Sequence, residues 1–304
     1  MPAPTRPILR YHGGKWRIAP WVISHLPPHR RYVEAFGGAG SVLLRKPRAE
    51  GEVYNDLDGE VVNVFRVLRD PVQAERLTSL LRLTPFAREE LSRAFSDAPS
   101  DDPVERARRT IIKSHLGMGT DAITRASRPG VSSRGRRAQA RYCPWPAPAG
   151  FRASDGDGVY APSWAQFPDL IAAFTARLAG VVIEHRDALE VIQIHDTPET
   201  LHYCDPPYVL STRADDRPDY RHELTDADHR ALAEVLHQVQ GMVVISGYPS
   251  DLYADLYGGW WCVRRLTYDA RKNQKTEMLW MNPAAMARMQ QSDLFEGALD
   301  VAAM

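Results

Sequence analysis

Cysteine is scarce in this chain, and long apolar runs are absent. The 304 residues include only Cys143, Cys204 and Cys262, which lie far apart and form no C-x-x-C spacing. This argues against a disulfide framework and a structural zinc site, and it fits a reducing compartment. The N-terminal MPAPTRPILRYHGGK contains no apolar signal region, and no apolar run approaches eighteen residues. We therefore expect a cytoplasmic protein that is neither secreted nor inserted in a membrane.

An excess of charge of either sign is also lacking, since 38 Lys and Arg residues stand against 38 Asp and Glu residues. Total charge gives no evidence of a polyanionic partner, so a nucleic-acid surface would have to come from the distribution of charge. The sequence contains no G-x-x-x-x-G-K-[ST] phosphate loop and no internal repeat. We interpret the histidines as scattered surface or core residues, and we expect no metal cofactor.

Two strand–turn–helix units follow each other near the N-terminus. In YVEAFGGAGSVLLR, residues 32–45, a short strand leads into a glycine turn and a helix that starts near Ser41. In EVYNDLDGEVVNVFRVLR, residues 52–69, a strand ends at Asn55-Asp56, and apolar residues then recur at helical spacing. This succession predicts an α/β fold with a parallel, doubly wound sheet. Further strands are predicted at 181–184, 201–204, 242–246, 260–268 and 277–280, with helices at 188–195, 225–239 and 250–257.

The middle of the chain has a different pattern. Helices are predicted at 72–83, 85–95 and 103–116, and residues 117–162 are rich in Gly, Pro, Ser and Arg. We infer one α/β domain, residues 1–70 and 175–283, which is interrupted by a mainly helical and loop-rich module at 71–174. The tail, residues 284–304, has no obvious docking face and is expected to be mobile.

The segment LHYCDPPYVL places Asp205, Pro206, Pro207 and Tyr208 directly after an apolar strand. Open α/β sheets bind ligands beyond the carboxyl ends of their strands, where these residues would lie. The prolines hold the backbone extended, and their carbonyls remain acceptors. Asp205 and the Pro206 carbonyl could each accept one N–H of a planar substrate with an NH2 group, and Tyr208 could stack on its ring. In isolation the motif is equally compatible with a strand that ends in a proline-rich turn.

Two weaker signals accompany this motif. In FGGAG, residues 36–40, glycines would let the backbone approach a ligand, and Asp56 after the next strand is placed to bind ribose hydroxyls. Asp56 alone would equally be a solvated acid or a helix cap. In RYHGGKWRIAPWV the glycine pair allows a tight turn, Lys15 could reach a carboxylate, and Tyr11 could face a sulfonium centre.

The segments YHGGK, VEAFGGAGSVLLRK, VYNDLDGEVVNVFRVLR, YCDPPY and KTEMLWMN occur in this order. The set resembles the Dam-type (D12 class) family of adenine-N6 DNA methyltransferases over roughly residues 8–69 and 180–282. The resemblance implies a Rossmann-like methyltransferase sheet and S-adenosylmethionine as the methyl donor, which would leave as S-adenosylhomocysteine. It also implies methyl transfer to adenine N6 in duplex DNA after base flipping, and a prokaryotic or phage protein associated with the nucleoid.

The family's site residues carry over motif by motif. The catalytic residues would be Asp205, Pro206, Pro207 and Tyr208. The cofactor-binding residues would be Tyr11, Lys15, Phe36, Gly37, Asp56, Asp187 and Asp205. Tyr11 stands where some members carry tryptophan, so an aromatic ring is kept. Acceptance of both amino hydrogens would point the N6 lone pair at the methyl donor, and the rate gain would come from positioning and preorganised electrostatics.

A local excess of basic residues predicts the DNA contact. Between residues 103 and 152 the only acids are Glu105 and Asp121, whereas arginine is abundant. Arginine suits both phosphate contacts and the reading of guanine, although a basic run is often only a solvated face. We expect the inserted module to recognise the target, with double-stranded DNA as the partner and neither a membrane nor an obligatory protein partner. The predicted DNA-binding residues are Arg125, Arg128, Arg134, Arg136, Arg137 and Arg141.

Other functions remain open at this point. Related amino-group methylases act on cytosine N4, or on glutamine side chains through Asn-Pro-Pro-Tyr; Asp205 and the basic insert favour adenine in DNA. A DNA-binding protein without turnover is a second alternative, against which the intact Asp205, Tyr208, Lys15 and Asp56 argue. A nicotinamide oxidoreductase would need the G-x-G-x-x-G spacing, which the chain lacks.

Replacing Arg136 and Arg137 with alanine is expected to weaken DNA binding and to flatten its salt dependence, because fewer counterions would be released from the phosphates. Binding titrations at several salt concentrations measure this. An unchanged salt slope would move the DNA interface to another part of the chain.

Overall fold

The structure is a computed structural model and describes residues 3–117, 160–213, 220–268 and 274–291. The chain divides into two compact units, which are described separately. The first contains Met1–Trp16, Asp58–Ala179 and Asp219–Arg221, and the second contains Arg17–Leu57, Gly180–Pro218 and His222–Met304. No helix in the described part of the chain has the length and apolar character needed to span a bilayer.

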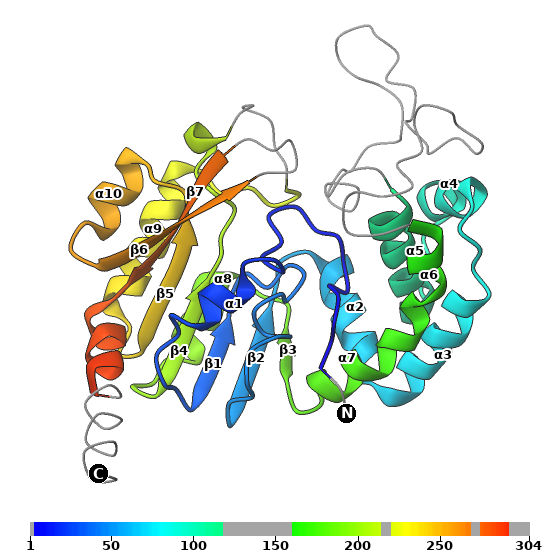
Figure 1. Cartoon of the computed structure of the whole chain (residues 1–304), viewed down its shortest axis with the longest axis horizontal. Helices are drawn as coiled ribbons and strands as arrows, with labels where there is room; N and C mark the ends of the chain where they lie inside the picture. Colours follow the sequence, from blue (N-terminus) through cyan, green and yellow to red (C-terminus); the bar gives the residue numbers. More distant parts are fainter. Residues whose placement is uncertain (1–2, 118–159, 214–219, 269–273, 292–304) are drawn as a thin grey trace, which may run out of the picture. The chain divides into compact units, whose positions relative to one another are not determined.

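The second unit is built on a seven-stranded sheet (Figure 1). Its strands are β1 (Arg31–Glu34), β2 (Gly51–Asn55), β3 (Val182–Glu184), β4 (Thr200–Cys204), β5 (Met242–Gly247), β6 (Trp261–Tyr268) and β7 (Gln274–Met281). They lie in the order β3-β2-β1-β4-β5-β7-β6. Strands β1 to β5 pair in parallel, whereas β7 runs antiparallel to both β5 and β6.

The α/β class is confirmed, but the expectation of a parallel sheet holds only for the first five strands. The sheet is mixed because β6 and β7 are consecutive in sequence. Only residues 269–273 separate them, whereas a parallel pair needs a crossover of a dozen residues or more. The strands themselves begin and end close to the ranges predicted from their apolar pattern.

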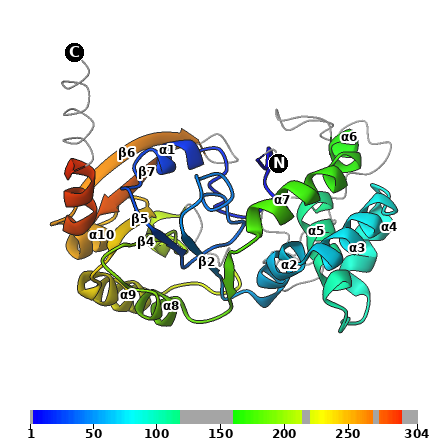
Figure 2. The same cartoon turned by 90° about the horizontal axis from the view of Figure 1, so that it is seen from below.

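Helices α8 (Ala188–Ile194) and α9 (Asp226–Gln238) lie together on one face of the sheet, and the short α1 (Ala19–Ile23) lies on the other (Figure 2). The core on the first face joins strand residues such as Val33 and Ile245 to helix residues such as Ile192 and Leu232. Helix α10 (Asp251–Tyr257) adds Tyr253 to this core.

Local caps explain where these helices begin. Thr225 and Asp228 form a capping box at the start of α9, and the side chains of Asp187 and Ser250 cap α8 and α10. Residues 283–291 are also helical, and Ala285 there is buried and donates its N–H to the Asn282 Oδ1 atom. The predicted tail thus starts within a helix, and residues 292–304 lie outside the described part.

The helix expected from Ser41 does not form, and that prediction was wrong. Residues 41–46 make separate turns, in which Leu44 donates its N–H to Gly40 and Lys46 donates its N–H to Val42. The N–H of Leu43 instead donates to the Glu34 carboxylate at 2.8 Å. This side-chain acceptor replaces the backbone carbonyl that a continuous helix would use.

The first unit is helical. It contains α2 (Gly59–Arg69), α3 (Pro71–Arg82), α4 (Arg88–Ser96), α5 (Pro103–Leu116), α6 (Tyr160–Ala165), the 3-10 turn Phe167–Leu170 and α7 (Ile171–Leu178). Asp58, Asp70 and Asp102 cap α2, α3 and α5, and proline opens α3 and α5 at the position where its missing N–H costs nothing. The described residues of the predicted module, 71–117 and 160–174, lie within this unit.

A buried ion pair stabilises the sheet next to β1. The Lys46 Nζ atom lies 2.9 Å from the Glu52 carboxylate, and both side chains are almost fully buried. The same ammonium group lies 4.5 Å from the centre of the Tyr32 ring. The attraction between the two charges therefore offsets the hydration free energy that both lose on folding.

Lys46→Met is expected to lower the free energy of unfolding by about 3–5 kcal/mol, because it removes the cation from a buried carboxylate. The double variant with Glu52→Leu should recover most of this loss. Urea denaturation followed by circular dichroism measures both. Arg30→Met, which breaks exposed ion pairs with Glu50 and Glu199, is the control and should leave the midpoint nearly unchanged. A similar shift in both single variants would contradict the importance of burial.

Candidate active site

The Asp-Pro-Pro-Tyr segment follows the central strand of the sheet. All five residues of β4 are buried, and β4 pairs in parallel with β1 on one side and β5 on the other. Pro206 is buried, while Asp205, Pro207 and Tyr208 are partly exposed. The segment therefore lies at the carboxyl edge of the sheet, where open α/β folds bind their ligands, and it is not packed away.

Asp205 is held by a serine from the neighbouring strand. The hydroxyl of Ser246, near the end of β5, donates to the Asp205 Oδ1 atom at 2.7 Å. Ser246 is fully buried, and its hydroxyl also lies 3.4 Å from the Tyr203 hydroxyl. This contact fixes the orientation of the Asp205 carboxyl group at the end of β4.

Tyr208 is constrained at its ring and at its hydroxyl. The hydroxyl donates to the Glu277 carboxylate of β7, and the ring meets the Tyr248 ring edge to face with the centroids 4.7 Å apart. Burial, together with the nearby carboxylate, raises the pKa of Tyr208 well above its ordinary value. The phenol therefore stays neutral and acts as a donor.

Several buried polar side chains lie next to the Asp-Pro-Pro-Tyr segment on one face of the sheet. The sequence motifs did not predict them. Register pairs Glu34 with Tyr203 across β1 and β4, and the same face carries Ser246 and Glu277. Glu34 accepts from the Tyr32 hydroxyl at 2.7 Å as well as from Leu43. The available signal was an acid or serine at the end of an otherwise apolar strand, since such a residue needs a buried partner.

The glycine turn after β1 is shaped by Tyr54. A Cβ atom at Gly37 would lie 2.2 Å from the Tyr54 ring, and the Tyr54 hydroxyl donates to the Gly38 carbonyl at 2.6 Å. Gly38 and Gly40 have φ of 49° and 60°, in the left-handed region that favours glycine. The Asp56 carboxylate accepts the Gly38 N–H at 2.7 Å. Asp56 and the turn are therefore adjacent, as the prediction for a shared ligand requires.

Asn55 joins three strand ends, a role that sequence reasoning did not assign to it. Its amide donates to the carbonyls of Ala35 and Arg186 at 2.9 and 3.1 Å, and its side-chain oxygen accepts the Arg186 N–H at 3.0 Å. Its own carbonyl accepts the Gly37 N–H at 2.7 Å. All these contacts tie the ends of β1 and β2 to the segment after β3. The sequence signal was an asparagine at the end of a buried strand, which satisfies such groups well.

Asp187 lies on the segment that Asn55 holds. Its carboxylate is exposed and accepts the Leu189 N–H at 2.8 Å as the N-cap of α8. The structure thus brings Phe36, Gly37, Asp56, Asp187 and Asp205 to the carboxyl ends of β1 to β4, within one unit.

Tyr11 and Lys15 belong to the helical unit. The predicted tight turn is present, because Gly14 donates its N–H to the Tyr11 carbonyl at 3.1 Å and Gly13 has φ of 68°. Lys15 is buried and donates to the Gly13 carbonyl at 2.9 Å. Tyr220 packs on this turn: a Cβ atom at Gly13 would lie 2.2 Å from its hydroxyl. Its contribution had no local signal, since it lies about 200 residues away.

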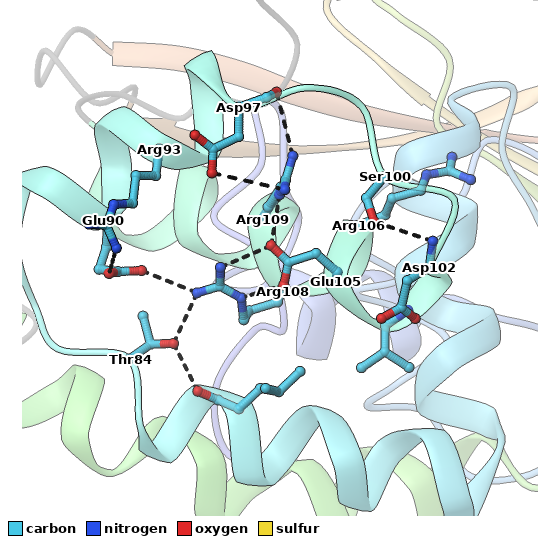
Figure 3. Close-up of polar contacts among 12 residues, drawn as sticks. Thr84, Glu90, Arg93, Asp97, Ser100, Asp102, Glu105, Arg106, Arg108 and Arg109 are labelled. Atoms are coloured by element: carbon cyan, nitrogen blue, oxygen red, sulfur yellow. Dashed lines mark hydrogen bonds and ion pairs between the residues drawn. The ribbon is translucent and has the colours of Figure 1, made fainter.

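The predicted DNA-binding residues Arg125, Arg128, Arg134, Arg136, Arg137 and Arg141 lie outside the described part of the chain. The three preceding arginines on α5 are described and have carboxylate partners, and Figure 3 shows those of Arg108 and Arg109. Arg106 pairs with Glu60 at 2.6 Å, and Arg108 and Arg109 pair with Glu105 at 2.7 and 2.8 Å. These arginines lower the pKa of Glu105. The basic excess counted from Pro103 is therefore partly neutralised on α5 itself.

The parallel strand core, the glycine turn with Asp56, and the Asp-Pro-Pro-Tyr segment at the same sheet edge form an arrangement typical of α/β proteins that bind nucleotide-like ligands at this edge. The model of the D12 class N6 adenine-specific DNA methyltransferase family matches residues 11–109 and 158–274. The chain belongs to this family and is an N6-adenine DNA methyltransferase. Membership implies S-adenosylmethionine as methyl donor and DNA as substrate.

Curated relatives agree with this family. The chain is 24% identical over 259 residues to a protein of Serratia marcescens named DNA adenine methylase, and the match covers 83% of this chain and 87% of that protein. It is 35% identical over 69 residues to a Vibrio cholerae protein of the same name, over 23% of this chain and 24% of that protein. The family match omits residues 110–157, the segment that holds all six predicted DNA-binding arginines.

Glu34→Gln is expected to remove a pH dependence of stability. Burial, with a smaller effect of the nearby Asp205 charge, raises the pKa of Glu34 from 4.5 to about 8. Because the folded state then binds this proton more tightly than the unfolded chain, the free energy of unfolding falls as pH rises through this range. The loss is on the order of 3 kcal/mol. Glutamine resembles the neutral carboxylic acid, so the free energy of unfolding of this variant should change less with pH.

Urea denaturation at pH 5, 6.5 and 8 measures the difference between the two proteins. Glu234→Gln on the exposed side of α9 is the matched control and should follow the unchanged protein. If Glu34→Gln showed the same slope as the unchanged protein, the buried carboxyl would not be neutral in the folded state.

Proposed function

We propose that Asp205 and the Pro206 carbonyl accept the two N6 hydrogens of a target adenine while Tyr208 stacks on its ring. The observation that carries this assignment is the fixed carboxylate at the end of β4, oriented by Ser246 at 2.7 Å. The proline carbonyl beside it belongs to rigid backbone. An acceptor pair and a ring of fixed orientation suit a flat aromatic amine.

The chemistry requires no covalent intermediate with the protein. The N6 lone pair of adenine is delocalised into the ring and is a poor nucleophile. Two acceptors placed out of the ring plane draw the amino hydrogens toward them and favour a tetrahedral nitrogen with a directed lone pair. Since the acceptors are already held by the strand ends, little reorganisation accompanies the reaction, and preorganised electrostatics supplies the rate gain.

The residues at the glycine turn fit the methyl donor that the family implies. Positive φ at Gly38 and Gly40 keeps side-chain atoms out of the turn, and the Asp56 carboxylate beside it suits ribose hydroxyls. We assign Phe36, Gly37, Asp56 and Asp187 to this ligand, with Tyr11 and Lys15 as its aromatic and cationic contacts. S-adenosylmethionine would supply an electrophilic methyl group on a sulfonium.

We further propose that the substrate is duplex DNA, from which the target base is extruded, because N6 of a stacked base is out of reach of such a site. The inserted module, residues 71–174, would recognise the target. The six arginines from Arg125 to Arg141 are its candidate contacts, and the omission of residues 110–157 from the family match supports a recognition element particular to this chain.

Asp205→Ala is expected to lower kcat by at least about 100-fold, because it removes the acceptor that orients the amino group, while DNA binding is retained. The protein is incubated with methyl-labelled S-adenosylmethionine and duplex DNA, and the DNA is then digested to nucleosides. N6-methyladenine is the expected product. Asp255→Ala on the exposed surface of α10 is the control and should keep the wild-type rate. Wild-type turnover by Asp205→Ala, or label in 4-methylcytosine, would overturn the proposed mechanism.

A further inference from the structure

Arg213 makes a set of contacts that the catalytic motif by itself does not account for. Its Nε and Nη2 atoms donate to the carbonyl oxygen of Tyr208 at 3.0 and 2.7 Å. Its Nη1 and Nη2 atoms donate to the Glu223 carboxylate, both at 2.8 Å. The Arg213 side chain is only 8% exposed and that of Glu223 17%. Each nitrogen of the guanidinium therefore has a partner in a shielded place.

This arrangement needs arginine and no other cation. The planar guanidinium presents its N–H groups in a rigid fork, so one edge can meet a carbonyl while the other meets a carboxylate. Lysine carries its three donors on one rotatable nitrogen, so it does not reproduce the two planar edges of the guanidinium. Charge-assisted hydrogen bonds of this kind are shorter and about twice as strong as neutral ones, and low exposure limits competition by water.

Arg213 holds Tyr208 at its backbone carbonyl, whereas two further contacts hold its side chain. Glu277 holds the hydroxyl and Tyr248 meets the ring, so both fix the outer part of the side chain. Pro207 restricts the backbone on the N-terminal side. Arg213 holds the carbonyl on the C-terminal side. The backbone and the side chain of Tyr208 are therefore both held by contacts from other elements.

We propose that Arg213, braced by Glu223, is a positioning residue that sets the plane of the Tyr208 ring for the target base. This inference rests on the proposed stacking role of Tyr208. In this role Arg213 acts through the backbone carbonyl of Tyr208, to which it donates. A displacement of about 1 Å in a reacting group can cost a factor of 100 in rate, so the loss of such a brace should appear in kcat.

The test is a double-mutant cycle in kcat, measured with full-length protein, duplex DNA and labelled S-adenosylmethionine. Arg213→Met is expected to lower kcat by about 10- to 100-fold, with KM for S-adenosylmethionine changed less than about 3-fold. In a Tyr208→Ala background the same substitution should change kcat less than about 3-fold, because there is no ring left to position. Glu223→Gln, which keeps an acceptor but loses the charge, should fall between Arg213→Met and the unchanged protein.

Two outcomes would overturn the proposal. One is an unchanged kcat for folded Arg213→Met; the other is an equal loss in both backgrounds, which would indicate a general structural effect. Arg230→Met, which breaks the exposed pair with Asp255, is the matched control and should keep the wild-type kcat. If circular dichroism shows that Arg213→Met does not fold, Arg213→Lys takes its place in the double-mutant cycle.

Asp205→Ala is measured in parallel to separate this proposal from the function on which it rests. If Asp205→Ala loses activity while Arg213→Met does not, the positioning role fails and the proposed mechanism stands. If Asp205→Ala keeps activity, the proposed mechanism fails whatever the result at Arg213.

Discussion

The parallel pairing of β4 between β1 and β5 is the constraint on which the site depends. It fixes the register of Glu34 opposite Tyr203 and of Cys204 opposite Ile245. The next residue along β4 is Asp205, so the carboxylate emerges where the ends of three strands meet. Backbone hydrogen bonds hold these ends, and the site requires no flexible loop to set the position of its acid.

Hydrogen bonds to buried polar groups fix the orientation of Asp205 and Tyr208 at this edge of the sheet. A hydroxyl or carboxyl without a partner in the interior would cost free energy, so the hydrogen bonds of Ser246 and Glu277 to Asp205 and Tyr208 offset part of the cost of burying these groups. The dependence is mutual, because the same bonds hold Asp205 and Tyr208 in one geometry. Stability of the sheet edge and order in the site therefore come from the same contacts.

On α5, the arginines of the basic stretch are paired with carboxylates. Arg106 joins α5 to Glu60 of α2, and Arg108 pairs with Glu105 within α5. Counting charges along the sequence could not reveal this, because Glu60 lies 46 residues before its partner. The family match includes Arg106, Arg108 and Arg109 but not the rest of the basic stretch, since it ends at residue 109 and resumes at 158.

By itself, the sequence determined the α/β class, the seven strands, most of the helices other than α1, α6 and α7, the tight turn at Gly13 and the family. These depend on periodicity, caps and motifs that act over a few residues. Only the tertiary structure decided that the sheet is mixed, that no helix follows Ser41, and that Arg213 and Glu277 converge on Tyr208. Glu277 lies 69 residues from that tyrosine, and no local pattern encodes such a contact. It exists because β5 and β7 pair in one particular register, which only the folded sheet defines.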